Sequence, residues 1–416
     1  MTVNHQSLLE EIERDRAKIV GFYQDFIRAK SPNPPGDTRE AVAHISRFLE
    51  AERLPFQIVA PVEQMPNVVG SFDAGTAGRH LVMNGHIDVF PVGDAGEWSH
   101  GGPWSGALHE GAVYGRGACD MKAGTTASIF TYRYLHRHRS QLKGKLTLTC
   151  VSDEETLGKW GSVYLLDHLL EVRGDCMLNG EPSGLYNVRF GEKGMFWLVI
   201  TVRTPGSHGA HTHRSASATK IASRLITDLE QVTRIAPKAP DGVVRALELA
   251  APGMEKSMGP GGAATISAVT LNIGSVHGGL KINMVPGECR IEVDIRLPVG
   301  VDEQQIKGEL NRILANYPEA SVEIVNFHPA SWCDPEGELM GILRGNVRKL
   351  SDIDPMPTVS LGGTDARLWR FRNIPAYVYG PPPMGMGSFD EHVKVDHLMH
   401  VVRTHVLSAF DYLSRA

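Results

Sequence analysis

The stretch Leu81–Asp88, with the sequence LVMNGHID, gives the strongest indication of the fold. Its apolar first half predicts a buried strand that ends at the segment carrying His86 and Asp88. Open α/β sheets bind ligands at the carboxyl ends of their strands, so this sequence places an imidazole at such an edge. Further on, GRGACDMK (residues 115–122) provides Asp120 immediately ahead of a predicted helix. A neutral imidazole and an aspartate on strand ends indicate the start of a metal site.

A lone His-x-Asp motif is far more often an ordinary hydrogen-bonded histidine than a metal ligand, so the interpretation depends on further acids. The predicted strand 145–151 is followed directly by Asp153, Glu154 and Glu155, and a short apolar segment is followed by Glu181. Each acid taken alone fits a solvated loop, but four strand-end sites in one chain argue against that explanation. Adjacent carboxylates raise each other's pKa unless a cation neutralises them. One acid can therefore bind a metal while its neighbour accepts a proton from water.

The order of the predicted elements indicates two domains, as the length of 416 residues also suggests. Helices and strands alternate over 1–192 and again over 329–416, which predicts a discontinuous α/β domain with a mixed sheet flanked by helices. The segment 193–328 has a βαββαβ order, which predicts an inserted α+β domain. Within it, the Gly- and Pro-rich stretch 252–263 is expected to be an exposed loop.

Two further stretches of the first domain carry specific expectations. Residues 7–29 have apolar positions at helical spacing and predict one amphipathic helix. Residues 91–114 predict a long polar loop, and loops of this length usually line a functional site or are disordered. Its Trp98 and Trp104 fit an ordered wall beside a substrate, although simple packing explains them equally well.

Composition excludes several classes of function. The formal net charge is −5 without a long run of one sign, which argues against nucleic acid as the main partner. Five scattered cysteines without a C-x-x-C pair fit reduced thiols in a cytoplasm. The N-terminus has no apolar signal segment, and no stretch approaches about 18 continuous apolar residues. We therefore predict a cytoplasmic protein without a membrane span.

These motifs together resemble the M20 family of metallohydrolases. The resemblance is carried by the segments NGHID (84–88), GRGACDMK (115–122), DEE (153–155) and GEPS (180–183), and it extends to SPNPPG (31–36) and the inserted domain. The family includes acetylornithine deacetylase, succinyl-diaminopimelate desuccinylase, aminoacylase-1 and the glutamate carboxypeptidases. The resemblance implies that 1–192 and 329–416 form a metal-binding catalytic domain, and that 193–328 form a lid that also makes a homodimer.

The resemblance also assigns roles at the strand ends. His86 corresponds to a ligand of one metal, with Asp88 orienting its ring, as a carboxylate commonly does beside a ligating histidine. Asp120 corresponds to a ligand that bridges two metals, in a segment where the family often has a cis peptide. The resemblance makes Glu154 the general base. It makes Glu155 a ligand of the second metal and Glu181 a ligand of the first.

Further resemblances concern substrate recognition. His208, in GSHGA (206–210), is similar to a histidine that stabilises the tetrahedral oxyanion and reaches the site of a neighbouring subunit; an ordinary surface histidine is the alternative. Asn283 and Arg296 are similar to lid residues that bind a substrate carboxylate, a task that suits a planar guanidinium. Ordinary sheet-edge polarity is the alternative for both. Gly363 and Thr364 lie in a segment similar to the family's glycine-rich substrate loop.

One position departs from the family pattern. The last metal ligand of the family is a histidine three residues before an Asp/Asn-Glu pair, and here Gly387 occupies that position. His392 lies five residues later and would have to substitute through a rearranged loop. The sequence therefore predicts one or two divalent metals per chain, with zinc, manganese and cobalt all compatible with carboxylate and imidazole ligands.

The leading hypothesis is a metal-dependent hydrolase of a C–N bond, acting on a small N-acyl amino acid or another carboxylate-bearing amide. A second hypothesis is a hydrolytic deaminase that releases ammonia from an atypical, possibly aromatic, amine. Trp98, Trp104, Phe389 and the missing histidine would suit it. A third is a non-catalytic ligand-binding homologue, against which the retained Glu154 argues, because a binding module needs no general base.

Overall fold

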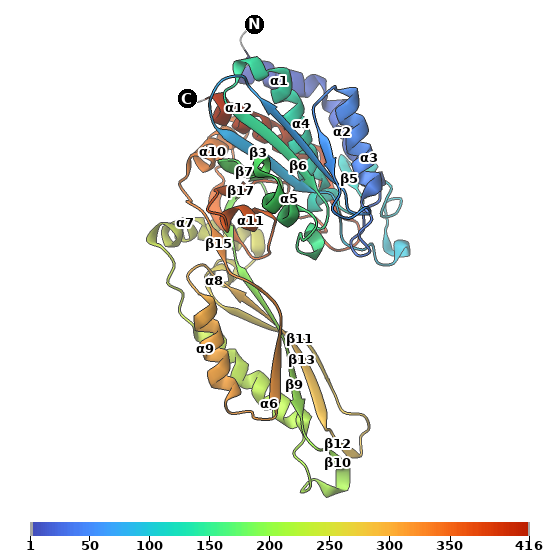
Figure 1. Ribbon diagram of the computed structural model, residues 1–416, viewed down its shortest axis with the longest axis vertical. Helices are drawn as coiled ribbons and strands as arrows, with labels where there is room; N and C mark the ends of the chain where they lie inside the picture. The colour runs from blue at the N-terminus through green and yellow to red at the C-terminus, as the bar shows by residue number, and fades with distance from the viewer. Residues whose placement is uncertain (1–2, 415–416) are drawn as a thin grey trace. The chain divides into compact units, whose positions relative to one another are not determined.

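The computed structural model describes residues 3–414, apart from the side chains of residues 256 and 257, and divides into two compact units (Figure 1). The first unit contains the chain up to Phe190, the segment Cys333–Thr358 and the chain from Thr364 onward. The second unit contains Gly191–Trp332 and the short segment Val359–Gly363. A mixed sheet flanked by helices and an inserted α+β unit confirm the predicted fold class.

The first unit is built on a mixed sheet whose central strands are parallel. The strand order is β1 (Gln57–Val59), β2 (Asn67–Asp73), β6 (Lys145–Val151), β3 (His80–His86), β7 (Cys176–Asn179), β17 (Ala376–Val378) and β8 (Asn187–Glu192). Strand β8 continues the pairing to β15 (Ser331–Trp332) and β16 (Met356–Ser360). Strands β6, β3, β7 and β17 run parallel, so their carboxyl ends lie at one edge of the sheet.

Helices cover both faces of this sheet (Figure 1). Helices α4 (Ala123–Arg137) and α12 (Val395–Ser414) pack against each other and against β3, and α10 (Glu338–Leu350) packs on α12. The opposite face carries α5 (Ser162–His168) and α11 (Ala366–Arg370). There Val82, Val151, Leu166 and Trp369 form part of one buried cluster. Both faces are therefore buried, as the continuous apolar runs of the parallel strands require.

The N-terminal helices differ from the single helix predicted for residues 7–29. The structure has α1 (His5–Arg14) and α2 (Arg16–Arg28), which meet at Asp15, followed by α3 (Arg39–Ala51). The Asp15 carboxylate accepts hydrogen bonds from Arg133 Nη1 (2.6 Å) and from the Tyr134 hydroxyl (3.0 Å), both on α4. Arg133 and Tyr134 lie more than a hundred positions after Asp15 in the sequence. The pattern of apolar residues therefore predicts the helices but not the break between them.

The predicted loop 91–114 is largely ordered. It contains a 3₁₀ turn at Ala95–Glu97 and the strands β4 (Ala107–His109) and β5 (Ala112–Tyr114), and β5 pairs with β18 (His392–Lys394). The Trp98 ring is buried, and the Arg116 guanidinium lies 5.2 Å from its centre. Trp98 therefore serves to pack the loop, which is the alternative that the sequence left open.

The second unit has the predicted βαββαβ core. Its antiparallel sheet has the strand order β11 (Thr270–Gly278), β13 (Glu288–Leu297), β9 (Gly194–Arg203) and β14 (Ala320–His328). Helices α6 (Ala218–Leu229) and α9 (Glu303–Leu314) pack on one face through residues such as Leu225 and Ile306. Along β13 the side chains alternate between exposed or half-buried and buried positions, the pattern of a sheet covered on one side.

The expectation of an exposed loop at 252–263 is wrong. The structure continues α7 (Asp241–Met258) through Pro252, and α8 (Gly262–Ser267) follows after a short turn. Val243, Ala246, Ala250 and Met254 recur at helical spacing on the buried side of α7. Burial of this apolar row outweighs the preference of proline and glycine for turns.

Among the described residues, no helix combines the length and the hydropathy that crossing a membrane requires.

Candidate metal centre

The strands of the first unit bring the predicted ligands to one edge. His86 is the last residue of β3 and pairs in parallel register with Val151, the last residue of β6. Strand β7 runs parallel to β3 on its other side and ends at Asn179. The loops that follow β6 and β7 therefore deliver Glu154, Glu155 and Glu181 to the edge where His86 lies.

The hydrogen bonds of His86 select one ring tautomer. Its Nδ1 lies 2.8 Å from the backbone oxygen of Asp88, which can only accept a hydrogen bond. Nδ1 therefore carries the proton, and in the neutral ring Nε2 keeps its lone pair. Nε2 lies 3.1 Å from Asp120 Oδ1 and 3.2 Å from Glu181 Oε1. A nitrogen lone pair facing two carboxylates at these distances suits a shared cation.

Two overlapping groups of ligand atoms form the cluster. His86, Asp120 and Glu155 make one group, and His86, Glu154 and Glu181 make the other, with all ligand atoms of each group within 4.8 Å of one another. Glu155 Oε1 is buried and accepts no hydrogen bond from the described residues. A buried acceptor without a partner is costly unless something else satisfies it. The donor set of imidazole and carboxylates fits a divalent metal of the zinc, manganese or cobalt type.

The electrostatics of the cluster also call for a cation. Burial raises the pKa of Glu154 and Glu155 well above their ordinary range, and neighbouring acids add to the effect. Burial and the charge of Asp120 raise the pKa of Glu181 to about 7. Burial alone would lower the pKa of His86, but Glu181 and hydrogen bonds to Asp120 raise it well above its ordinary value. Bound positive charge would remove this repulsion between the ionised acids.

We expect chelation to destabilise the protein in a pH-dependent way. Glu181 loses its proton near pH 4.5 when unfolded but near 7 in the metal-free fold, so metal-free stability falls as the pH rises through this window. The raised pKa of His86 likewise makes the stability of the metal-free protein fall as the pH rises above 6.5. Metal binds only the deprotonated ligands. At a free metal concentration a hundred times the dissociation constant, binding raises the free energy of unfolding by about 2.7 kcal/mol.

Urea unfolding with added metal and with chelator, from pH 4.5 to 7.5, measures this prediction. The gap between the two free energies of unfolding should widen with pH. Buried histidines such as His44 and His405, whose pKa values burial lowers to about 4, titrate in both samples and cancel in the difference. A gap that is constant with pH would contradict the placement of the metal among these acids.

Asp88 contacts both the His86 ring and the turn after β6. Its backbone oxygen holds the His86 ring, whereas its carboxylate Oδ1 lies 3.5 Å from Nδ1. The carboxylate accepts the backbone N–H groups of Glu154 (3.2 Å) and Glu155 (3.1 Å) and the side-chain amide of Asn33 (2.9 Å). Asp88 therefore fixes the turn that presents Glu154 and Glu155 as well as the ring of His86.

A chain of buried amides positions Glu181. Asn179 Nδ2 donates to Asn84 Oδ1 (2.8 Å), and Asn84 Nδ2 donates to Thr149 Oγ1 (3.1 Å). Asn179 Oδ1 in turn accepts the backbone N–H of Glu181 (2.7 Å). The sequence analysis missed Asn84 and Asn179 as functional residues, although both stand at the predicted strand ends. Both are polar residues in otherwise apolar strands, and this feature of the sequence could have identified them.

Glu391 holds the segment that carries Asp120. Its buried carboxylate accepts Arg116 Nη1 (2.7 Å) and the backbone N–H groups of Gly117 (3.2 Å), Cys119 (2.9 Å) and Asp120 (3.1 Å). The peptide bond after Asp120 is cis, as the family resemblance implied. Glu391 was visible in the sequence only as the second acid of the Asp/Asn-Glu pair, and its contacts come from the fold.

A guanidinium lies beside Glu154. Arg367 Nη1 is 3.5 Å from Glu154 Oε1 and donates to the backbone oxygen of Thr364 (2.6 Å). Asp365 lies in the same buried environment, where its Oδ2 accepts the Ser162 hydroxyl (2.6 Å). The predicted substrate residue Thr364 therefore belongs to the segment that contacts Glu154, whereas Gly363 lies in the second unit.

His392 does not join the cluster. Among the residues that the structure describes, it belongs to neither group of candidate ligands. Its Nδ1 lies 2.8 Å from the backbone oxygen of Asp390, and its ring stacks on Tyr114 with centres 4.7 Å apart. Gly387 has a φ of 71°, a left-handed conformation that favours glycine and disfavours a side chain at this position.

The second unit brings two of its three predicted residues together. Strand β10 (Ser207–His208) pairs with β12 (Met284–Val285), and the Gly209 N–H donates to the backbone oxygen of Asn283 (2.7 Å). His208 and Asn283 are therefore neighbours, and both are exposed. Arg296 lies toward the other end of β13, roughly 27 Å from Glu288, the end of this strand that follows β12, at 3.4 Å per residue. It donates to Asp294 at 2.8 and 3.1 Å, so its guanidinium already has a carboxylate partner.

Comparison with known proteins identifies the family. The family model described as peptidase family M20/M25/M40 matches residues 82–410, which contain all the cluster residues. The chain belongs to the M20 family. Succinyl-diaminopimelate desuccinylase of Cereibacter sphaeroides (strain ATCC 17029 / ATH 2.4.9) is 27% identical over 361 residues, covering 84% of this chain and 88% of the relative. The enzyme of the same name from Gluconacetobacter diazotrophicus is 27% identical over 400 residues, covering 93% of this chain and 94% of the relative.

Solved structures of M20 members share the fold. An M20 family metallo-carboxypeptidase from Sulfolobus solfataricus superposes with a TM-score of 0.81 at 16% identity and covers 95% of this chain and 99% of its own. A dinuclear metal binding peptidase of the M20 family from Bacillus subtilis has a TM-score of 0.63 at 14% identity, covering 96% and 99%. The protein is thus an M20 hydrolase that acts on C–N bonds of amides or peptides with a divalent metal, as the sequence predicted.

Proposed function

We propose that this M20 hydrolase removes the acyl group from a small N-acyl amino acid or a related carboxylate-bearing amide. The observation that supports it most directly is the cluster of one imidazole and four carboxylates, one of which is Glu154. The names of its relatives describe removal of a succinyl group from succinyl-diaminopimelate, an amide that carries carboxylates. Their identity to this chain is 27%, so the acyl group and the amine are open to experiment.

The chain supplies binding and proton transfer. His86, Asp120, Glu155 and Glu181 would hold the cation, which lowers the pKa of water and polarises a carbonyl when bound. Glu154 takes a proton from the attacking water and passes it to the leaving nitrogen. Arg367, 3.5 Å from Glu154 Oε1, keeps this carboxylate aimed at the cluster.

Substrate recognition in this proposal uses the residues that the family resemblance marks. Thr364 of the first unit and Gly363 of the second lie in one glycine-rich loop whose amides bind a substrate anion. His208 stabilises the oxyanion in the site of a neighbouring subunit of a homodimer, and Asn283 binds the substrate carboxylate beside it. The pairing of β10 with β12 supports a joint role for His208 and Asn283. The Arg296–Asp294 ion pair supports a structural part for Arg296 instead.

The test is a pair of product assays on the metal-loaded enzyme. N-acetyl, N-succinyl and N-formyl amino acids are assayed for release of the free carboxylic acid, and aromatic amines are assayed for release of ammonia. Acid release from at least one acylated amino acid, lost on chelation, supports the proposal. Ammonia release alone supports the deaminase hypothesis, which Gly387 in place of the family ligand favours. Tight binding without turnover of any substrate supports the non-catalytic alternative.

We infer that His392 is outside the metal site, because it belongs to neither group of ligand atoms and its ring stacks on Tyr114. We expect His392→Ala to leave the metal content per chain unchanged from the parent protein, measured by elemental analysis after purification without chelator. His86→Ala is the matched control and should reduce the metal content. A fall from two metals to one in His392→Ala would place His392 in the second site and contradict this inference.

A further inference from the structure

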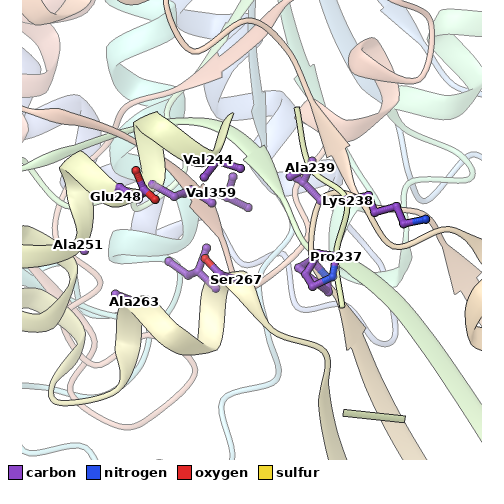
Figure 2. A pocket seen from close by; sticks show the side chains of 13 residues that line it. Pro237, Lys238, Ala239, Val244, Glu248, Ala251, Ala263, Ser267 and Val359 are labelled. Carbon is purple, nitrogen blue, oxygen red and sulfur yellow. The ribbon is translucent and has the colours of Figure 1, made fainter. Parts of the chain in front are cut away.

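The second unit contains a cavity of about 390 Å³ (Figure 2). It lies between helices α7 and α8 and the segments that contain residues 237–239, 298–299 and 359. Pockets of about 300–1,000 Å³ are the usual size of small-molecule sites. Helix α7 contributes Val244, Glu248 and Ala251 to the lining, α8 contributes Ala263, and the neighbouring segments contribute Lys238 and Val359. All of these residues belong to the second unit, whereas the metal cluster belongs to the first.

Small side chains on both helices leave the cavity open. Ala251 on α7 and Ala263 on α8 line it from the two helices, where larger apolar residues would fill it. Val244, Val299 and Val359 extend the apolar wall. The cavity opens to solvent, where Val244 is 41% exposed, and its apolar wall suits a ligand with an apolar body.

The walls are held in place by capping contacts. At the start of α8, the Glu255 carboxylate accepts the N–H groups of Gly261 (2.8 Å) and Ala263 (3.0 Å). At its end, the buried Lys193 Nζ donates to the backbone oxygens of Thr265 (2.8 Å) and Ala268 (2.7 Å). Both ends of a six-residue helix are thus fixed by charged side chains. The cavity is therefore preformed, which reduces the entropy lost on binding.

The opposite wall is also fixed. The Lys238 N–H donates to the Gly300 oxygen (2.9 Å), which fixes the segment containing Pro237 and Ala239. The Lys193 N–H donates to the oxygen of Ser360 (2.9 Å), the residue after Val359. Lys193 thereby joins α8 to the strand that leads into the glycine-rich segment 361–363.

The charged groups of the lining select the charge of the ligand. Figure 2 shows the Lys238 side chain extending away from the two helices, so its ammonium leaves the cavity. The acidic side chain of the lining is Glu248, on the same helix as Val244 and Ala251. A ligand with an apolar body and a cationic head satisfies both the apolar wall and this carboxylate.

We propose that this cavity is a second ligand site, which takes a small organic amine with an alkyl or aryl body. The body lies against the apolar wall that includes Ala251 and Ala263, and the ammonium group pairs with Glu248. Because the body contacts Val359, the occupied site restrains the segment 359–363. This inference does not depend on the reaction that the metal cluster performs.

Calorimetric titration of the metal-loaded protein with n-hexylammonium, 1-hexanol and hexanoate tests the choice of charge. We expect the amine to bind about two- to fivefold more tightly than the alcohol, the range of one partly exposed ion pair, and hexanoate to bind most weakly. Glu248→Gln should abolish the difference between amine and alcohol while leaving alcohol binding unchanged. Equal binding of all three probes by the parent protein would overturn the proposed amine preference.

Location is tested separately. Ala251→Phe fills the cavity and should remove binding of n-hexylammonium, whereas Leu249→Phe, on the exposed side of the same helix, should not. In the parent protein, the amine should slow amide hydrogen exchange in 262–268 and 359–363. Binding that survives Ala251→Phe, or protection confined to the first unit, would place the amine elsewhere and overturn the proposal. The exchange result on the parent protein stands even if the Phe variant does not fold.

Discussion

Glu154→Gln is expected to lower kcat by about 10²–10⁴-fold, the usual contribution of a positioned general base. The amide has nearly the same shape as the carboxylate but cannot accept the proton of the attacking water. The measurement is the steady-state rate of acid release on the substrate found in the product assays. KM should change little, because Glu154 contributes to proton transfer more than to substrate binding.

The metal content separates this effect from loss of the site. Glu154 belongs to the group with His86 and Glu181, but the group of His86, Asp120 and Glu155 is complete without it. We therefore expect Glu154→Gln to retain its metal by elemental analysis. Glu97→Gln, an exposed change in the loop 91–114, is the matched control and should retain full activity. Unchanged kcat in Glu154→Gln with metal bound would exclude Glu154 as the base.

The variant should also fold well. Burial raises the pKa of Glu154, and the charges of Glu181 and Asp365 raise it further, so the ionised side chain is electrostatically unfavourable in the metal-free protein. A neutral glutamine removes one of these repelling charges. Its melting temperature in chelator should therefore equal or exceed that of the parent. A large loss of stability would indicate that the ion pair with Arg367 outweighs the repulsion.

The sequence predicts the position of the cluster because parallel strands have a simple geometry. A buried apolar run followed by His86 or by Glu154 and Glu155 places those residues at the carboxyl edge, whatever the details of the loops. The structure has this arrangement, with His86 and Val151 in register. The local sequence is sufficient to place these residues because the change from apolar to polar residues marks the end of each strand.

The sequence does not predict contacts that depend on distant segments. Glu391 reaches the backbone of Asp120 across more than 270 positions, and Asp15, where α1 and α2 meet, contacts Arg133 and Tyr134. No spacing rule brings such residues together. The helices α7 and α8 were missed for a different reason, because Pro252 and the glycines around it have turn preferences that burial of Ala250 and Met254 overrides.

His208→Ala is expected to lower kcat by about 10²–10³-fold, the effect of removing one oxyanion donor. The reason is chemical, since the developing negative charge on the carbonyl oxygen loses a hydrogen-bond partner while the metal ligands stay intact. His208 is exposed in the second unit, so the change should leave stability and metal content unaffected. His211→Ala, an exposed histidine of the same loop, is the matched control and should keep near-parent activity.

Mixing two inactive variants tests whether His208 acts on the partner subunit. If His208 acts in the partner's site of a homodimer, a heterodimer of His208→Ala and Glu154→Gln has one site with both residues intact, because that site takes Glu154 from one chain and His208 from the other. Random exchange between two-fold symmetric dimers makes half of them mixed and half of their sites intact, so roughly a quarter of parent activity should return. If His208 instead serves the site of its own chain, every site of the mixture lacks one of the two residues and no activity returns. Recovery on mixing would thus require both the dimer and the exchange of His208 between its sites.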